Sequence, residues 1–270
     1  VSYKQIARLI GMPDHARRVG RALVCLETVD STNNEVKRRA LAGAADGLAV
    51  VAEQQTGGRG RRGRSFVSPA GQGLYLSVLL RPRCPLEEVS TLTAWTAVAV
   101  CNAVERVCGV RPGIKWPNDV ILDGRKLCGI LTELELEAET AALRHVVVGV
   151  GINLTQTAAD FGPEVAPVAV SLAQALGRAP RRAEMAAAVL AALDELYAAF
   201  PAERAAWLER YRADCLTLGR TVRLLRAGEE EEAFAEAVDD AFALVVRRAD
   251  GSREAVSSGE VSVRGLLGYV

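Results

Sequence analysis

The dipeptide Asp123-Gly124, which joins the apolar runs VIL and LCGIL, constrains the fold more than any other feature of this sequence. Asp-Gly between two apolar runs is a strong signal for a tight turn between antiparallel strands. Other segments have the composition of strands, namely ALVCLETV, LAVVAEQ, GLYLSVLLR and HVVVGVGINL. The sequence therefore predicts a sheet of several strands with antiparallel pairing at this hairpin.

Helical segments alternate with these strands. The segment DSTNNEVKRRALAG predicts a helix, because Thr32 and Glu35 form a capping-box pattern and Gly43 follows the last turn. Residues 23–215 are therefore expected to form one α+β domain, a mixed sheet flanked by helices. Further helices are predicted at residues 86–108, at about 182–200 and 203–214, and within a short N-terminal extension, residues 1–22.

The composition changes near Leu216. From there to the C-terminus the sequence contains five short strand-like segments separated by turn residues, such as TVRLL and FALVVRR. Short strands at this spacing are typical of a small barrel. We expect residues 216–270 to form a separate β-domain of that kind.

Charge and cysteine usage exclude several classes of protein. The 270 residues include 33 Lys+Arg and 33 Asp+Glu, which argues against a surface devoted to nucleic acid or membrane. No apolar run reaches the roughly 18 residues that span a bilayer, and the first residues do not resemble a secretory signal. The six cysteines form no CxxC pair, so we expect reduced cysteines, a cytoplasmic protein and no metal site.

The stretch GGRGRRGR, residues 57–64, is called the Gly/Arg loop below. Glycines allow backbone N–H groups to approach a ligand, and arginines are forked donors suited to carboxylate and phosphate. Like charges repel in the empty loop, so we expect it to be mobile and to close over an anionic ligand. A solvated basic loop or a nucleic-acid contact explains this segment equally well when it is taken alone.

Gly58, Gly60 and Gly63 also match the G-x-G-x-x-G fingerprint of dinucleotide-binding folds. That fingerprint has to open a helix, whereas the residues that follow here predict a turn and a strand. No HRD or Walker A sequence accompanies the glycines. We therefore expect neither a Rossmann fold nor a kinase.

Five motifs occur together and in order: DSTNNE, EQQTGGRGRRGRSF, KWPNDV, GRKLCGILTE and GVGINL. In order and spacing they resemble the biotin protein ligases, strongly over residues 23–155 and more weakly over the C-terminal segment, which resembles that family's SH3-like domain. The resemblance implies an ATP-dependent enzyme that converts biotin to biotinyl-5'-AMP. It then transfers biotin to a lysine of the biotin carboxyl carrier protein of acetyl-CoA carboxylase or related carboxylases.

The resemblance also implies roles for individual residues. Three of them, Lys126, Arg61 and Lys115, are expected to act in catalysis. Biotin is expected to contact Ser31, Thr32, Asn33, Gln55, Arg59, Gly60, Arg61 and Lys126. ATP and the adenylate are expected to contact Arg62, Arg64, Phe66, Asn118, Asp119 and Asn153, with Mg²⁺ carried by ATP rather than by a protein site.

The sequence departs from the family pattern in three places. Only about 22 residues precede the first predicted strand, so we expect a monofunctional ligase without a DNA-binding domain. Phe66 stands where the family often has tryptophan, and the turn DDAFAL has Ala and Phe where glycine is usual. The resemblance leaves a homodimer open, because some members pair through sheet edges.

Three rival interpretations remain at this point. A lipoate or octanoate transferase of the same superfamily would carry an Arg-Arg-x-Ser-Gly-Gly-Gly stretch, which is absent. An RNA-binding protein would add exposed aromatics near the Gly/Arg loop, yet aromatic residues make up 5% of the chain and none interrupts the loop. A degenerate ligase would bind biotin without transferring it.

Overall fold

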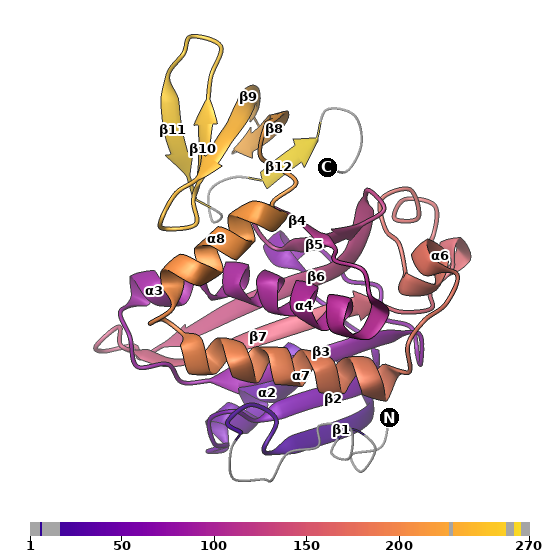
Figure 1. Cartoon of the computed structure of the whole chain (residues 1–270). Coiled ribbons are helices and arrows are strands. Elements are labelled where there is room, and N and C mark those ends of the chain that lie inside the picture. The colour runs from indigo at the N-terminus through magenta and orange to yellow at the C-terminus, as the bar shows by residue number, and fades with distance from the viewer. Residues whose placement is uncertain (1–5, 7–16, 227–228, 258–261, 266–270) are drawn as a thin grey trace.

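The computed structural model describes residues 6, 17–226, 229–257 and 262–265 (Figure 1). The helix expected within residues 1–22 lies mostly outside this part of the chain. Residues 17–22, which are described, form turns and bends. Within the described ranges, no helix is both long and apolar enough to cross a membrane.

A seven-stranded mixed sheet forms the centre of the larger domain, as the sequence predicts. The strand order is β1-β2-β3-β7-β6-β5-β4, and the β1–β2 pair is parallel whereas the other neighbours are antiparallel. The first helix of the sheet domain lies between these two parallel strands in the sequence. The strands are β1 (Leu23–Val29), β2 (Ala49–Gln55), β3 (Gly73–Leu80), β4 (Gly113–Lys115), β5 (Asp119–Leu122), β6 (Arg125–Leu136) and β7 (Leu143–Asn153).

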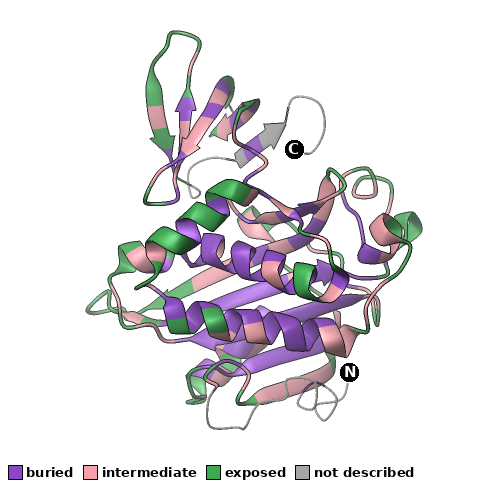
Figure 2. Ribbon diagram, in the orientation of Figure 1, coloured by how far each residue is buried: buried purple, intermediate pink, exposed green. Residues whose placement is uncertain are grey.

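Helices cover the two faces of this sheet unequally. The helices α4 (Leu92–Cys108) and α7 (Arg182–Ala199) lie side by side across one face, with α8 (Arg204–Asp214) beside α4, while α2 (Thr32–Leu41) packs on the other face (Figure 1). Strand β7 shows the division, because Val146, Val148 and Val150 belong to the core cluster under α4 and α7, whereas Val147 packs with Val36 of α2. Figure 2 shows this core as a buried layer between the sheet and the two long helices. Beyond α2, the second face of the sheet stays open.

The Asp123-Gly124 turn forms as predicted. Both residues have positive φ, 52° and 70°, which are the left-handed conformations that a tight two-residue hairpin needs. The register of β5 and β6 places Leu122 opposite Arg125. The hairpin thereby holds the start of β6 next to the segment that precedes β5.

Two local predictions were wrong. The helix expected over residues 86–108 is divided at Thr91 into α3 (Leu86–Ser90) and α4, which ends as expected at Gly109. The capping box of Thr32 and Glu35 does not form, because Ser31 is the N-cap residue and Glu35 pairs with Arg38 and Arg39 instead. The segment after β7 contains the short helix α5 (Ala158–Phe161) and is followed by α6 (Leu172–Leu176).

The C-terminal segment forms the expected second sheet. Five antiparallel strands follow the order β11-β10-β9-β8-β12, and they lie beyond the C-terminal end of α8 (Figure 1). Leu216 lies between α8 and β8, and the domain boundary there stays a prediction. The strands are β8 (Arg220–Arg226), β9 (Glu229–Val238), β10 (Leu244–Arg247), β11 (Arg253–Val256) and β12 (Ser262–Gly265).

Candidate functional site

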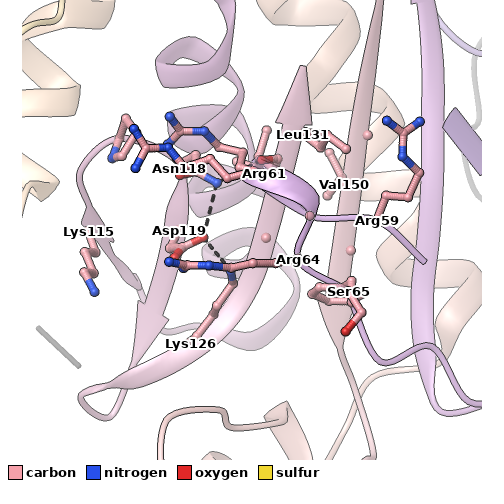
Figure 3. A pocket seen from close by; sticks show the side chains of 18 of the residues that line it. Arg59, Arg61, Arg64, Ser65, Lys115, Asn118, Asp119, Lys126, Leu131 and Val150 are labelled. Atoms are coloured by element: carbon pink, nitrogen blue, oxygen red, sulfur yellow. Dashed lines mark hydrogen bonds and ion pairs between the residues drawn. The ribbon is translucent and has the colours of Figure 1, made fainter. Parts of the chain in front are cut away.

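A cavity of about 550 Å³ lies on the open face of the large sheet, next to the N-terminal end of α2 (Figure 3). Its walls come from segments that are far apart in the sequence: the start of α2, the end of β2, the Gly/Arg loop, the KWPND segment and strands β6 and β7. The structure brings nearly all of the sequence-predicted site residues into this wall. They are Ser31, Thr32, Asn33, Gln55, Arg59, Gly60, Arg61, Arg62, Arg64, Phe66, Lys115, Asn118, Asp119 and Lys126.

At one end of the cavity, a polar network fixes the side chains of α2 and β2. Gln55 Oε1 accepts hydrogen bonds from the Thr32 backbone N–H at 2.8 Å and from Thr32 Oγ1 at 3.1 Å. Gln55 Nε2 donates to Ser68 Oγ at 2.9 Å, and Ser77 Oγ lies 2.6 Å from Asn33 Oδ1. Thr32 therefore contacts a residue of β2 instead of capping its own helix. These fixed donors and acceptors suit a small polar ring such as an amide or ureido group.

At the other end, cations and amides converge. Lys126 Nζ lies 2.6 Å from Asp119 Oδ1, and Arg61 Nη1 donates to Asn118 Oδ1 at 2.9 Å (Figure 3). Asn118 is itself held by its Nδ2, which donates to the backbone carbonyl of Ile130 at 2.9 Å. Lys115, 6% exposed, lines the same wall.

The charge balance at this end favours an anionic ligand. Burial lowers the pKa of the Arg61 guanidinium; Asp119 opposes this shift, while the neighbouring Arg62 and Arg64 lower the pKa further. Two acidic residues, Asp119 and Glu164, line the cavity. The basic residues in the wall are Arg59, Arg61, Arg62, Arg64, Lys115, Lys126 and Arg223. A phosphate or carboxylate placed here would offset this excess of positive charge.

The floor of the cavity consists of bare backbone at three glycines that sequence reasoning missed. A Cβ atom at Gly149 would lie 2.1 Å from Asn33 Oδ1, and one at Gly151 would lie 2.7 Å from the Phe66 ring. Gly129 pairs with Gly151 across the β6–β7 ladder and also lies under the Phe66 ring. The pattern Gly149-x-Gly151 within a strand was the available signal, because residues two apart share a face of the sheet.

Asn153 is the predicted site residue that the structure does not bring into the cavity wall. Its Nδ2 donates to the backbone carbonyl of Val170 at 3.2 Å, and its Oδ1 accepts from Gln156 Nε2 at 3.2 Å. The side chain is 3% exposed. Asn153 thus ties the end of β7 to the segment before α6.

The small sheet also reaches the cavity, which sequence reasoning did not foresee. Arg223 of β8 and Val263 of β12 line the wall, together with Glu164 and Val168 of the loop between α5 and α6. Trp116 connects the two sheets, because its indole Nε1 donates to the backbone carbonyl of Phe242 at 3.0 Å. No local sequence pattern marks these contacts, since each depends on how the second sheet packs against the first.

The described residues of this site are poorly suited to holding a metal ion by themselves. In the described part of the chain, no group of three or more His, Cys, Asp or Glu side chains is placed to hold a metal ion. Asp119 is paired with Lys126, and Asn118 accepts from Arg61. The residues present fit a Mg²⁺ ion coordinated mainly by substrate phosphates, with Asp119 or Glu164 as the carboxylates within the wall.

Comparison with known proteins agrees with this geometry. The profile of the Biotin/lipoate A/B protein ligase family matches residues 25–153, and that of the Biotin protein ligase C terminal domain matches residues 217–264. The solved biotin protein ligase from Aquifex aeolicus in complex with biotin and ATP is similar in structure, with a TM-score of 0.75 at 29% identity. That match covers 90% of this chain and 99% of the Aquifex chain.

Two relatives show how far the sequence similarity extends. A biotin–[acetyl-CoA-carboxylase] ligase of Mycobacterium tuberculosis is 35% identical over 247 residues, which cover 89% of this chain and 88% of the relative. The bifunctional ligase/repressor BirA of Bacillus spizizenii is 38% identical over 179 residues, which cover 66% of this chain and 54% of that protein, so the match spans about half of its length. The two matched family profiles fall in the two sheet regions, and the chain belongs to the biotin protein ligase family.

Proposed function

We propose that this chain activates biotin with ATP to form biotinyl-5'-AMP and then transfers biotin to a lysine of a biotin carboxyl carrier protein. One observation carries the proposal: a single cavity joins a fixed polar network at one end to a cluster of cations at the other. Such a site suits a substrate with a polar ring and a carboxylate, placed against a second anion. The similarity to a ligase that binds biotin and ATP supports the same pair of substrates.

In the proposed complex, the biotin ureido group binds between Ser31, Thr32 and Gln55. Thr32 and Gln55 are already hydrogen-bonded to each other, so little side-chain entropy is lost when the ligand binds. The apolar ring and chain run along the wall formed by the Phe66 ring and the glycines of β6 and β7. The carboxylate then lies near Lys126 and Arg61.

In the first step, a biotin carboxylate oxygen attacks the α-phosphorus of ATP. A bond forms between that oxygen and phosphorus, and the bond from phosphorus to the bridging oxygen of the leaving group breaks to release pyrophosphate. Lys126, Lys115 and Arg61 stabilise the negative charge that builds up on the α-phosphate and on the leaving group. Mg²⁺ bound with ATP would neutralise further phosphate charge.

In the second step, the amine of the acceptor lysine attacks the carbonyl carbon of the mixed anhydride. An amide forms, AMP leaves with the bonding electron pair, and the amine loses a proton. The Gly/Arg loop and Phe66 exclude water from the anhydride between the two steps. Asp119 is paired with Lys126, and we propose that it helps to orient the incoming amine and accepts the proton that the amine loses.

The compartment is part of the proposal. The described cysteines are all free, and burial raises the pKa of Cys101, Cys128 and Cys215, so their thiols are unreactive. Free thiols of this kind are typical of the reducing cytoplasm, where carboxylases work. We propose that the enzyme acts there.

Pyrophosphate release tests the proposal directly. Purified protein is incubated with Mg²⁺-ATP, and pyrophosphate is measured after addition of biotin, lipoate or octanoate. We expect release with biotin and none above background with the other two acids. Release with lipoate or octanoate alone would favour an acyltransferase of the same superfamily, and salt-sensitive RNA binding without any release would favour the nucleic-acid interpretation.

A further inference from the structure

We propose that Glu133 is the latch that fixes the start of the Gly/Arg loop to the body of the enzyme, and that it does so through Arg59. This proposal rests on the proposed function: by holding the loop closed, the latch determines how long the acyl-adenylate is retained. Glu133 lies on β6 outside the cavity wall. It is the last residue of the GRKLCGILTE motif, but the sequence analysis gave it no role. In this arrangement Arg59 is an anchor for the loop.

The geometry around Glu133 joins three elements at one carboxylate. Glu133 Oε1 accepts from Arg59 Nη2 at 2.8 Å and from Lys37 Nζ of α2 at 2.6 Å. Glu133 Oε2 accepts from Nδ2 of Asn33 at 2.8 Å. Arg59 is held a second time by Asn34 Oδ1, which accepts from Nη1 at 2.8 Å.

The position of Arg59 separates it from the other arginines of the loop. In Figure 3 its guanidinium lies on the other side of the cavity from the group formed by Arg61, Asn118 and Lys126. Arg61 bonds to the KWPND segment, whereas Arg59 bonds to β6 and α2. The two side chains therefore hold the loop at opposite sides of the cavity.

Burial and charge make the latch dependent on the ionised carboxylate. The Glu133 side chain is 15% exposed, so solvent screens it less than an ordinary surface acid. Burial alone would raise the pKa of Glu133, but hydrogen bonds from Lys37 and Asn33 and the charges of Lys37 and Arg59 lower it overall. If the negative charge is removed, Lys37 and Arg59 face each other without a counter-ion and repel.

The same carboxylate also positions a residue of the cavity wall. Asn33 lies between Glu133 and Ser77, with its Oδ1 directed at the Ser77 hydroxyl and its Nδ2 at Glu133. Loss of Glu133 would thus affect both the loop and Asn33. Arg59→Gln separates these effects, because it releases the loop and leaves the Asn33–Glu133 hydrogen bond in place.

The first experiment measures how often the Gly/Arg loop opens, and its readout does not depend on catalytic activity. Trypsin cleaves after arginine, so its rate of cleavage after Arg61, Arg62 and Arg64 of the ligand-free, full-length protein reports how often the loop opens. All variants compared here keep these three sites. We expect Glu133→Gln and Arg59→Gln to increase this rate roughly fivefold, in line with the loss of one partly screened ion pair. Glu135→Gln is the matched control, because Glu135 is an exposed carboxylate two residues along the same strand.

The second experiment measures retention of biotinyl-5'-AMP. The radiolabelled adenylate is loaded onto each variant, and its release is followed after dilution into unlabelled compound. We expect Glu133→Gln and Arg59→Gln each to accelerate release about fivefold, and the double variant to release it no faster than either single variant, because both substitutions break one interaction. In Glu133→Gln, the rate of pyrophosphate release at saturating substrates should change less than the rate of adenylate release.

The outcomes separate the latch from the function on which it rests. Equal trypsin cleavage in the wild type and both variants, with unchanged melting temperatures, overturns the latch. Additive effects in the double variant would also overturn it, since they would mean that Glu133 and Arg59 act independently. Failure of the wild-type protein to bind the adenylate would refute the proposed function, while the cleavage comparison would still decide the latch.

Discussion

At the scale of single residues, similar side chains have different roles because of the elements that surround them. Arg61 and Lys126 both lie in the cavity wall, yet Arg61 is held by the amide of Asn118 and Lys126 by the carboxylate of Asp119. Lys126 is followed on β6 by the apolar run LCGIL, and its ammonium is held next to the carboxylate of Asp119. These two cations act on different events in the proposed reaction.

Lys126→Ala should abolish adenylation without unfolding the protein. Removal of one donor to developing charge typically costs about 10²–10³ in rate, and we expect the rate of biotin-dependent pyrophosphate release to fall by that factor. Arg125→Ala, at the adjacent position of β6, is the control and should keep most of the activity. Normal pyrophosphate release by Lys126→Ala would rule out its catalytic role.

Arg61→Gly should shorten retention of the adenylate. The substitution removes the hydrogen bond from the loop to Asn118 and one of the cations that face the phosphate. We expect biotinyl-5'-AMP to escape at least tenfold faster, as measured by biotinylation of bystander proteins or by dilution of labelled adenylate, since a hydrogen bond to a charged group contributes about 1.5–3 kcal/mol. Arg83→Gly, in an exposed loop, is the control, and equal retention in both variants would contradict the assignment.

At the scale of elements, the cavity exists because β6 and β7 present glycines where the other side chains of the sheet would fill the space. The Phe66 ring lies on Gly129 and Gly151 and meets Tyr75 edge to face, with ring centroids 6.5 Å apart. The neighbouring valines on the opposite face of β7 are fully packed under the helices. One strand thus serves as core on one side and as binding surface on the other.

Gly151→Ala should therefore weaken binding of ATP more than it weakens the fold. The new methyl group would lie 2.7 Å from the Phe66 ring and force it to move. Overpacking of this kind costs roughly 1–3 kcal/mol, so we expect the KM for ATP in the pyrophosphate assay to rise about tenfold or more.

Gly43→Ala provides the matched control for that substitution. It places alanine at a positive φ of 86°, in open space at the end of α2. It should lower the melting temperature and leave the KM for ATP unchanged. Similar KM values for both variants would show that the Phe66 ring tolerates a side chain on the floor.

The elements that the sequence predicted correctly are those with local causes. The Asp123-Gly124 hairpin, the apolar strands and the end of α4 at Gly109 all follow from residues close to one another in the chain. The Thr32 cap failed because the side chain bonds to Gln55, 23 positions away. Arg223 had no local signal, and the GRKLCGILTE motif contains Glu133 without indicating its contact with Arg59. Both positions depend on packing between distant segments.

At the scale of the whole molecule, the small sheet supports the segment that carries Lys115 and Asn118. Trp116 donates to the carbonyl of Phe242, and Tyr211 of α8 donates through its hydroxyl to the carbonyl of Pro117 at 3.1 Å. Tyr211 and Phe242 pack edge to face with centroids 5.5 Å apart. The second sheet therefore contacts the segment that carries the proposed catalytic residues and helps to hold it in place.

Trp116→Phe should impair both stability and adenylation. The substitution removes the indole N–H and leaves the buried carbonyl of Phe242 without that donor, which costs about 1–3 kcal/mol. We expect a lower melting temperature and a lower kcat for pyrophosphate release, because the adjacent Lys115 and Asn118 lose their support.

Trp95→Phe is the matched comparison for Trp116→Phe. Trp95 is fully buried in the core, and its indole nitrogen has no hydrogen-bond partner among the described residues. It should lower the melting temperature through lost packing and leave kcat nearly unchanged. Equal loss of kcat in the two variants would mean that the contact with the second sheet does not position the catalytic segment.

Because Val263 closes part of the cavity wall, a nascent polypeptide cannot complete the binding site until the segment that carries Val263 has emerged from the ribosome. The large sheet, whose strands end at Asn153, is translated long before that moment. A partly synthesised chain would thus possess the reactive lysines and arginines without the full enclosure that confines an activated acyl group. Full confinement of the adenylate would then begin only once both sheets are present.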